Sequence, residues 1–426
     1  MNRRTERTKW FLEDRYGMFI HWGLYAIPAR GEWVRSFEKI SNEDYQKYFE
    51  EFNPTQYNPK EWAKAAKAAG QKYVVLTTKH HDGFCLFDSK LTDYKATNTP
   101  AKRDLIEDYV SAFREEGLKV GFYYSIIDWY HEHYPAYGDR IHPMRDNEAY
   151  KDKEIDFDTY LEYMHGQVKE LLTNYGKIDI MWFDFSYDDM TGEKWKATEL
   201  VNMIRDIQPD ILIDNRLGGN IKAGNPEVYA GDFFSPEQIV PPEGILDEDG
   251  EQVPWEACIT LNDNWGYHAK DTNYKSPKQV IRTLVECVSK NGNILLNVGP
   301  DAKGLIPDQS IAILAEVGKW MQRNGDSIYG CQAADLAKPE WGRYTQNGNK
   351  LYAHVFDRGI GPIYFAGLKG KIKKARLLAD GSELKVFTPW MAEEYSDIEG
   401  GAFITLPGAR LPDESDTVIE LELIEG

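Results

Sequence analysis

Short apolar runs alternate with longer amphipathic segments over most of the chain. Apolar runs bounded by turn residues are typical of buried strands, whereas apolar residues three and four apart are typical of helices. This pattern predicts strands at residues 17–22, 72–78, 119–125, 177–184, 211–215, 228–234, 257–261 and 293–298. It predicts helices at residues 60–69, 104–116, 158–174, 194–207, 278–290 and 309–323. The segment after the first strand, which contains Glu32 and Trp33, is expected to be a loop.

Alternating strands and helices favour parallel strands joined by right-handed crossovers. Eight such strands indicate an irregular (β/α)8 TIM-like barrel, in which loop replaces the helix after the sixth strand. No Gly-x-Gly-x-x-Gly motif follows the first strand, so a dinucleotide-binding fold has no support. Beyond residue 330 only short strand-like runs remain, at 350–356, 361–365, 371–378, 384–387, 403–406 and 417–423. We therefore predict a catalytic barrel over residues 1–330 and a C-terminal all-β sandwich domain over 331–426.

The charge balance narrows the range of partners. A formal net charge of −19 argues against nucleic acid or an anionic membrane, because both require basic patches. The 26 Tyr and 12 Trp fit either stacking on sugar rings or core packing. No apolar segment follows the charged residues 1–6, so we see no signal peptide and expect a cytoplasmic protein. The four widely spaced cysteines form no CxxC pair and are expected to be free thiols.

Polar side chains recur where the predicted strands end. The strand at 177–184 ends on Asp184, and the corresponding positions on other strands are His21, His80, His81, Arg216 and Glu237. In a parallel barrel these ends meet at one mouth, where active sites are built. We therefore expect these side chains to converge on one site.

Two of these residues are carboxylic acids, and glycoside hydrolysis needs two. Asp184 and Glu237 come from the fourth and sixth predicted strands, so they can face each other across the mouth. Other candidates for the second acid are Glu32, Glu243, Glu251 and Glu256. Glu256 begins the seventh strand at the end opposite the mouth, which favours a structural role.

The remaining candidates support or line such a site. Arg216 beside Asp184 would keep that carboxylate ionised, and its alternative role is a buried salt bridge in the barrel rim. His80 and His81 suggest metal ligands, but neighbouring strand residues point to opposite faces, so hydrogen bonding to hydroxyls is favoured. Trp33, Trp182 and Trp265 form an apolar wall or belong to the core.

Taken together, these motifs resemble one family, the α-L-fucosidases of glycoside hydrolase family 29. The matching runs are GMFIHWG at 17–23, KHHDGF at 79–84, KRDL at 102–105, GFYYS at 121–125, WFD at 182–184, WGY at 265–267 and NILLNVGP at 293–300. They cover nearly the whole predicted barrel. One departure is Phe185-Ser186, which stands where relatives often have a Gly-containing run after the nucleophile, so we expect a local change in pocket shape.

The resemblance implies a retaining exo-glycosidase that removes terminal α-L-fucose through a covalent fucosyl-enzyme. Asp184 takes the position of the nucleophile, and Glu237, in the run Ser-Pro-Glu, that of the acid and base. The positions that contact fucose are His21, Glu32, Trp33, His80, His81, Tyr123, Trp182, Arg216 and Trp265. No metal or cofactor is implied, and the expected partner is an oligosaccharide carrying terminal α-L-fucose.

Three alternatives differ in chemistry. The same scaffold could hydrolyse another 6-deoxy or galacto-configured sugar, or bind fucose without turnover. A barrel metallohydrolase using His21, His80 and His81 is the third. The sequence leaves open the linkage preference, the oligomeric state, a homo-oligomer included, and the role of the C-terminal domain.

Overall fold

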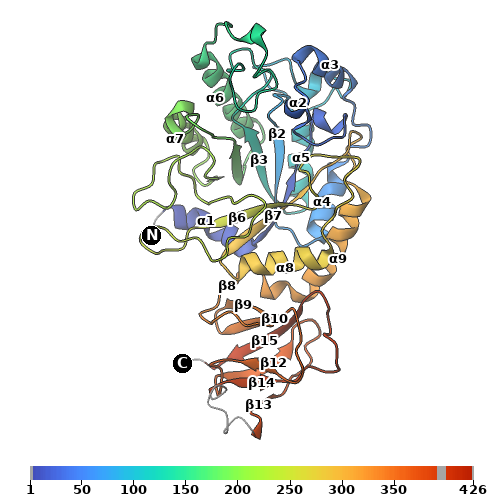
Figure 1. The fold of residues 1–426 in the computed structure, drawn as a ribbon, viewed down its shortest axis with the longest axis vertical. Helices are drawn as coiled ribbons and strands as arrows, with labels where there is room; N and C mark the ends of the chain where they lie inside the picture. Colours follow the sequence, from blue (N-terminus) through green and yellow to red (C-terminus); the bar gives the residue numbers. More distant parts are fainter. Residues whose placement is uncertain (1–2, 391–399, 425–426) are drawn as a thin grey trace.

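The computed structural model describes residues 3–390 and 400–424, and within these it has an α/β part followed by an antiparallel β part (Figure 1). The α/β part is a curled parallel sheet with the strand order β5-β4-β3-β2-β1-β7-β6. Its strands are β1 (Tyr16–Ile20), β2 (Tyr73–Lys79), β3 (Lys119–Ser125), β4 (Ile180–Asp184), β5 (Leu212–Ile213), β6 (Trp255–Thr260) and β7 (Gly292–Val298). The predicted TIM-like fold is confirmed, with seven strands in place of eight.

The strand predicted at residues 228–234 is wrong. This segment contributes only single bridges, from Phe233 to Asp214 after β5 and from Phe234 to Trp255 at the start of β6. A turn containing Gly231, with φ of 87°, interrupts the extended backbone. A Cβ at this position would lie 2.3 Å from the carbonyl oxygen of Asp214, so only glycine permits the close approach. The gap in the barrel is thus bridged at isolated residues and not by a continuous ladder.

The six predicted helices are present as α4 (Pro59–Ala68), α5 (Leu105–Glu115), α6 (Phe157–Asn174), α7 (Ala197–Ile207), α8 (Pro277–Val288) and α9 (Asp308–Asn324). Three helices were not predicted, namely α1 (Arg3–Asp14), α2 (Val34–Phe37) and α3 (Asn42–Glu51). The last two lie in the segment expected to be a loop. α1 is largely charged, yet its Phe11 is fully buried and contacts Phe233 and Tyr73 with ring centroids 4.8 Å and 5.6 Å apart. It therefore closes the end of the barrel opposite the strands' carboxyl ends. No helix among the described residues is long and apolar enough to cross a membrane.

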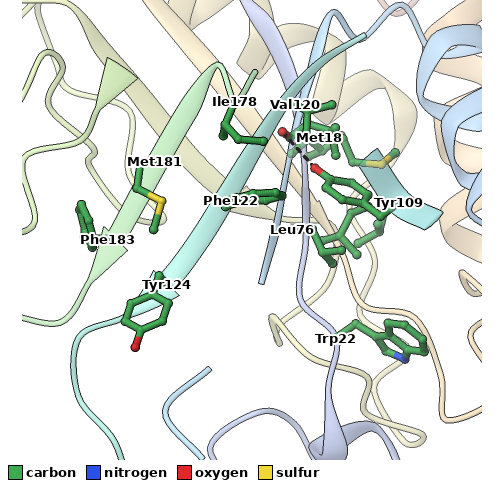
Figure 2. Close-up of a cluster of buried hydrophobic side chains, with 14 of the residues drawn as sticks. Met18, Trp22, Leu76, Tyr109, Val120, Phe122, Tyr124, Ile178, Met181 and Phe183 are labelled. Carbon is green, nitrogen blue, oxygen red and sulfur yellow. Dashed lines mark hydrogen bonds between the residues drawn. The ribbon is translucent and has the colours of Figure 1, made fainter. Parts of the chain in front are cut away.

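Alternation along the strands divides the core into two layers. One set of residues packs outward against the helices, as Figure 2 shows for Met18, Leu76, Val120, Phe122 and Met181. The neighbouring set points inward and fills the barrel with Phe19, Tyr73, Val75, Tyr123, Ile180, Trp182, Leu212 and Leu295. Because side chains alternate with a period of two, the next inward residue after Phe19 or Trp182 emerges at the mouth.

The C-terminal part contains two antiparallel sheets, with orders β12-β15-β10-β9-β8 and β11-β14-β13. Its strands are β8 (Gln332–Ala333), β9 (Gly342–Asn347), β10 (Lys350–Val355), β11 (Ile363–Phe365), β12 (Ile372–Leu377), β13 (Val386–Phe387), β14 (Ala402–Ile404) and β15 (Thr417–Leu423). One apolar cluster joins residues of both sheets, as a sandwich requires. The polar β8 and β9 were not predicted. The exact domain boundary at residues 330 and 331 stays a prediction, and residues 391–399 and 425–426 of the second predicted domain lie outside the described residues.

Candidate active site

A small pocket, with a cavity volume of about 50 Å³, opens at the carboxyl ends of the parallel strands. All but one of the predicted site residues line it. The lining consists of His21, Trp33, His80, His81, Tyr123, Trp182, Asp184, Arg216, Glu237 and Trp265, with Phe19, Phe185 and Cys258 in addition. The exception, Glu32, is buried directly behind this wall.

Asp184 is the last residue of β4 and continues the inward row of Ile180 and Trp182. Its Oδ2 accepts a hydrogen bond from the Tyr123 hydroxyl at 2.8 Å, and its Oδ1 accepts one from Arg216 Nη1 at 2.9 Å. Burial raises the pKa of Asp184, although Arg216 opposes this by favouring the ionised form. The carboxylate is therefore held in one orientation, with a cation and a hydroxyl on its two oxygens.

Glu237 lies at the pocket rim, with 44% of its side chain exposed. The same Nη1 of Arg216 that contacts Asp184 donates to Glu237 Oε2 at 2.9 Å. Two further bonds anchor the guanidinium, from Nε to the Ser235 hydroxyl at 3.1 Å and from Nη2 to the Ser235 carbonyl at 3.2 Å. One fixed arginine thus joins the two carboxylates that the sequence paired.

His21 continues the inward row of β1. Its Nδ1 lies 2.7 Å from Asn297 Oδ1, while the amide nitrogen of Asn297 donates to the Trp265 carbonyl at 2.8 Å. Since the amide nitrogen is engaged there, Oδ1 must accept, and the proton of His21 resides on Nδ1. Burial lowers the pKa of His21 to about 3, so the ring is neutral and its Nε2 is a hydrogen-bond acceptor.

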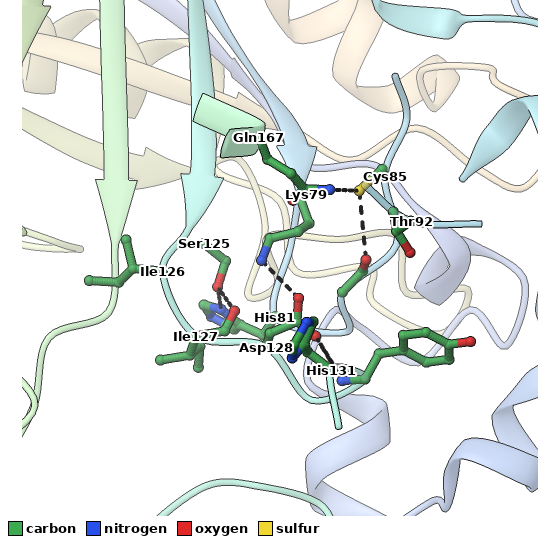
Figure 3. A network of polar contacts seen from close by, with 12 residues as sticks. Lys79, His81, Cys85, Thr92, Ser125, Ile126, Ile127, Asp128, His131 and Gln167 are labelled. Atoms are coloured by element: carbon green, nitrogen blue, oxygen red, sulfur yellow. Dashed lines mark hydrogen bonds and ion pairs between the residues drawn. The ribbon is translucent and has the colours of Figure 1, made fainter. Parts of the chain in front are cut away.

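His81 is held in the same tautomer by a different partner (Figure 3). Its Nδ1 lies 2.7 Å from the Ser125 hydroxyl, which itself donates to the Ile127 carbonyl at 2.8 Å. A hydroxyl has one proton, so Ser125 must accept from His81 Nδ1. The pKa of His81 is lowered by burial, which leaves a neutral Nε2 that faces Asp184 Oδ2 at 3.8 Å.

The expectation that His80 and His81 point to opposite faces is wrong. The pairing of β2 with β3 shifts register between Thr77 and Lys79, and β2 ends at Lys79. Both histidines therefore follow the end of the strand, where alternation no longer applies, and their ring centroids are 4.0 Å apart. The Nδ1 of His80 is buried and has no hydrogen-bond partner within the described chain, so a bound ligand can satisfy it.

The same register shift sends Lys79 outward into a buried ion pair (Figure 3). Its ammonium lies 2.9 Å from Asp128 Oδ2, and both side chains are almost fully buried. The other oxygen of Asp128 accepts from the backbone N–H groups of Tyr130 and His131, each at 2.8 Å. This pair fixes the loop that brings Trp129 against Trp33, with ring centroids 5.3 Å apart.

Glu32 supports the wall from behind. Its Oε2 accepts the Gly266 N–H at 2.7 Å, which ties its loop to the segment that carries Trp265. Burial raises the pKa of Glu32 to about 7, while the hydrogen bonds from backbone N–H groups oppose the rise. Trp265 packs on His21 with ring centroids 5.0 Å apart. Glu32 therefore positions one aromatic side of the pocket.

The other candidate acids lie away from the pocket. Glu243 and Glu251 are exposed and are not among its lining residues. Glu256 is fully buried at the opposite end of the barrel, where the Tyr73 hydroxyl donates to it. Burial raises its pKa to about 8. The structure therefore brings only Glu237 among these glutamates to Asp184.

Several residues of the site were not predicted. Asn297 and Ser125, which hydrogen-bond to His21 and His81 from behind the pocket lining, lie inside motifs that were noticed, and their positions in the inward rows could have identified them. Cys258 gave no sequence signal beyond that alternation. Among the described residues, no group of three or more His, Cys, Asp or Glu side chains is placed to hold a metal ion. All four cysteines are buried and free.

Comparison with known proteins connects this site to a family. A family profile described as Alpha-L-fucosidase matches residues 2–326. The human tissue alpha-L-fucosidase is 28% identical over 432 residues, covering 93% of this chain and 84% of that protein. The structure of alpha-L-fucosidase isoenzyme 1 from Paenibacillus thiaminolyticus is 71% identical, with a TM-score of 0.98 and 100% of both chains covered. A GH29 alpha-L-fucosidase from Bacteroides thetaiotaomicron, solved as a trapped covalent intermediate with 2-fluoro-fucosyl fluoride, is 32% identical, with a TM-score of 0.83 over 99% of this chain and 96% of that one.

Proposed function

The chain belongs to the α-L-fucosidases of glycoside hydrolase family 29, and we propose that it removes terminal α-L-fucose with retention, Asp184 being the nucleophile and Glu237 the acid and base. The observation that carries this proposal is the shared contact of both carboxylates with Arg216 Nη1. Asp184 Oδ1 and Glu237 Oε2 are each 2.9 Å from that nitrogen, so these two oxygens lie no farther apart than twice that distance. Such a close approach fits retaining enzymes, whose two carboxyl groups are about 5–5.5 Å apart.

In the first step Asp184 attacks the anomeric carbon and the bond to the glycosidic oxygen breaks. Glu237 gives its proton to that oxygen, so the leaving group departs as a neutral alcohol. The rim position of Glu237 suits this role, because a bound fucoside extends out of the pocket from its glycosidic oxygen. Tyr123 and Arg216 hold the attacking carboxylate, so little reorganisation is needed as its charge is consumed.

In the second step Glu237, now ionised, removes a proton from water, which attacks the anomeric carbon. The bond to Asp184 breaks, the carboxylate is regenerated, and fucose leaves with its original anomeric configuration. Two inversions at one carbon give net retention. The trapped covalent intermediate of the Bacteroides relative supports such a route.

Recognition of the sugar follows from the histidine tautomers. The Nε2 atoms of His21 and His81 are acceptors, so they favour ligands that present hydroxyl protons to them. A sugar lacking one of these hydroxyls leaves a buried acceptor unpaired, which costs about 1–3 kcal/mol. Trp33 and Trp265 supply apolar surface for the C5 methyl group of a 6-deoxy sugar.

The nucleophile is tested with Asp184→Ala. We expect this variant to lose hydrolysis of an aryl α-L-fucoside while it still binds fucose and unfolds at the same temperature. Substantial turnover by the variant would remove Asp184 from its role. A panel of other aryl glycosides run with the wild type decides between fucose and related 6-deoxy or galacto-configured sugars.

The acid and base is tested with Glu237→Ala. Substrates with poor leaving groups should suffer most, because good leaving groups need little protonation. Azide should restore the rate on an activated fucoside and yield α-fucosyl azide, since it attacks the β-linked fucosyl-enzyme without a base and inverts the anomeric carbon a second time. Glu251→Ala is the matched control, a loop glutamate outside the pocket. If the control shows leaving-group dependence and azide rescue, the assignment moves to that loop.

A further inference from the structure

An aromatic surface runs outward from the pocket, formed by Trp33, Phe37 and Phe185 and named here the aromatic shelf. Trp33 lines the pocket, with its ring centroid 5.1 Å from that of His81. On its other side Phe37 stacks on it at 5.9 Å with an interplanar angle of 24°. Phe185 packs on Trp33 at 5.5 Å. The three rings form a continuous surface from the pocket wall to the outside.

The outer ring of the shelf is unusually exposed. Phe37 is 75% exposed, and among the described residues only Trp390 is another aromatic side chain with such exposure. A short helix, α2, holds Phe37 in place, with its backbone N–H bonded to the Trp33 carbonyl at 3.0 Å. Because Phe37 is continuous with Trp33 and Phe185, the three rings form an apolar patch of the kind that marks a ligand-binding surface.

The third ring of the shelf, Phe185, has a strained backbone. Phe185 has φ of 96°, a region that favours glycine and is unusual for a bulky side chain. It directly follows Asp184, and besides Trp33 it contacts His81 and Tyr187 with ring centroids 5.2 Å and 5.5 Å apart. Such strain persists only where surrounding contacts compensate, and it concentrates at functional sites. Here it places an aromatic ring in the pocket wall, directly after Asp184.

We propose that the aromatic shelf binds the first sugar ring of the leaving group, which is a pyranose attached to the terminal fucose. This inference rests on the proposed function. A terminal fucose occupies the pocket with Asp184, and Phe37 is not among the pocket-lining residues, so a ligand that reaches Phe37 must extend outward. In a fucoside only the leaving group does so.

The chemistry of the shelf fits a sugar ring. Pyranoses have an apolar face of C–H groups, which packs on the electron-rich face of an aromatic ring. A stable protein partner needs about 800 Å² on each side, which three rings do not supply. The shelf therefore selects substrates whose fucose is joined to a ring able to lie flat on it.

The test compares two substrates that differ only in the leaving group, α-L-fucosyl fluoride and a fucosyl disaccharide. Fluoride reaches no part of the shelf. For Phe37→Ala we expect kcat/KM to fall about three- to tenfold on the disaccharide and to stay unchanged on the fluoride, as the loss of one ring contact implies. Phe37→Trp should restore the disaccharide rate. Trp390→Ala, at an exposed aromatic of the C-terminal part, is the matched control and should change neither rate.

Other outcomes overturn the inference. An equal fall on both substrates would mean that Phe37 acts on the fucose pocket, and no fall would mean that the leaving group does not touch it. Ile239, which is 56% exposed and two residues beyond Glu237, offers a competing surface. Selective loss with Ile239→Ala and none with Phe37→Ala would place the leaving group there. If the wild type fails to hydrolyse the fluoride at all, the proposed function itself fails, which is a different result.

Phe185 gives a second readout. Phe185→Gly removes the ring and accommodates φ of 96° without strain, so the variant should fold. We expect the ratio of the disaccharide rate to the fluoride rate to fall, whichever way the fluoride rate moves. A folded variant with an unchanged ratio would remove Phe185 from the shelf.

Discussion

Replacing Glu256 by Gln tests whether the barrel holds a neutral carboxylic acid at the end opposite the active site. The side chain is fully buried, and burial raises its pKa from 4.5 to about 8, with the hydrogen bond from the Tyr73 hydroxyl opposing the rise. An acid with a raised pKa keeps its proton longer in the folded state than in the unfolded state. The free energy of unfolding therefore falls as pH rises from about 4.5 to 8.

A pKa rise from 4.5 to about 8 corresponds to roughly 5 kcal/mol of unfolding free energy. Glutamine has nearly the same shape and no charge, so the variant lacks this loss. We expect the stability of Glu256→Gln relative to the wild type to increase by several kcal/mol between pH 4.5 and pH 8. Because the comparison is between two proteins that share all other titrating groups, those groups largely cancel.

The assay is urea unfolding followed by tryptophan fluorescence at several pH values for both proteins. A difference that stays constant across this pH range would refute the reasoning, because it would mean that Glu256 ionises as easily when folded as when unfolded. The same variant bears on catalysis. Its activity on substrates with poor leaving groups should remain near that of the wild type, and azide should have no effect.

Three further predictions concern the support of the site. Ser125→Ala removes the acceptor that keeps the proton of His81 on Nδ1, so kcat/KM on an aryl fucoside should fall roughly five- to fiftyfold; an unchanged rate and an unchanged ¹⁵N spectrum of the ring would contradict this. Arg216→Met removes the cation that opposes the raised pKa of Asp184, so the acidic limb of the pH–rate profile should move to higher pH. Arg216→Lys keeps a positive charge and should move the limb less. An acidic limb that stays in place would show that another group keeps Asp184 ionised. Lys79→Met leaves the buried carboxylate of Asp128 without its cation and should cost about 3–5 kcal/mol of stability, measured by thermal unfolding. Neutralising both Lys79 and Asp128 should recover part of that loss. An unchanged melting temperature for Lys79→Met would contradict the buried ion pair.

The sequence predicted the location of the site because side-chain alternation is a local property. An inward-pointing residue near the end of a parallel strand must emerge at the mouth, whichever strands are its neighbours. This rule selected His21 and Asp184, and it also applies to Asn297 and Ser125, which were overlooked inside recognised motifs. It failed for His80 and His81, since a one-residue register shift between two strands cannot be read from either strand alone.

The sixth predicted strand shows that local sequence is also an incomplete guide to the fold. Residues 228–234 have the composition of a strand, yet the turn at Gly231 lets the chain approach Asp214 closely and leaves only single bridges. Helix α1 was missed because its charged residues hide the fact that Phe11 closes the barrel. In each case a contact between distant segments outweighed the local preference.

What the sequence determined by itself was the alternation of strands and helices, the acids at 184 and 237, and the motifs that indicated the family. Only the tertiary structure decided that one nitrogen of Arg216 contacts both acids, that Glu256 faces the opposite end, and that the exposed Phe37 stacks on Trp33. The reason is physical. Periodicity is set by the geometry of neighbouring residues, whereas distances across the mouth depend on how loops from different strands pack together.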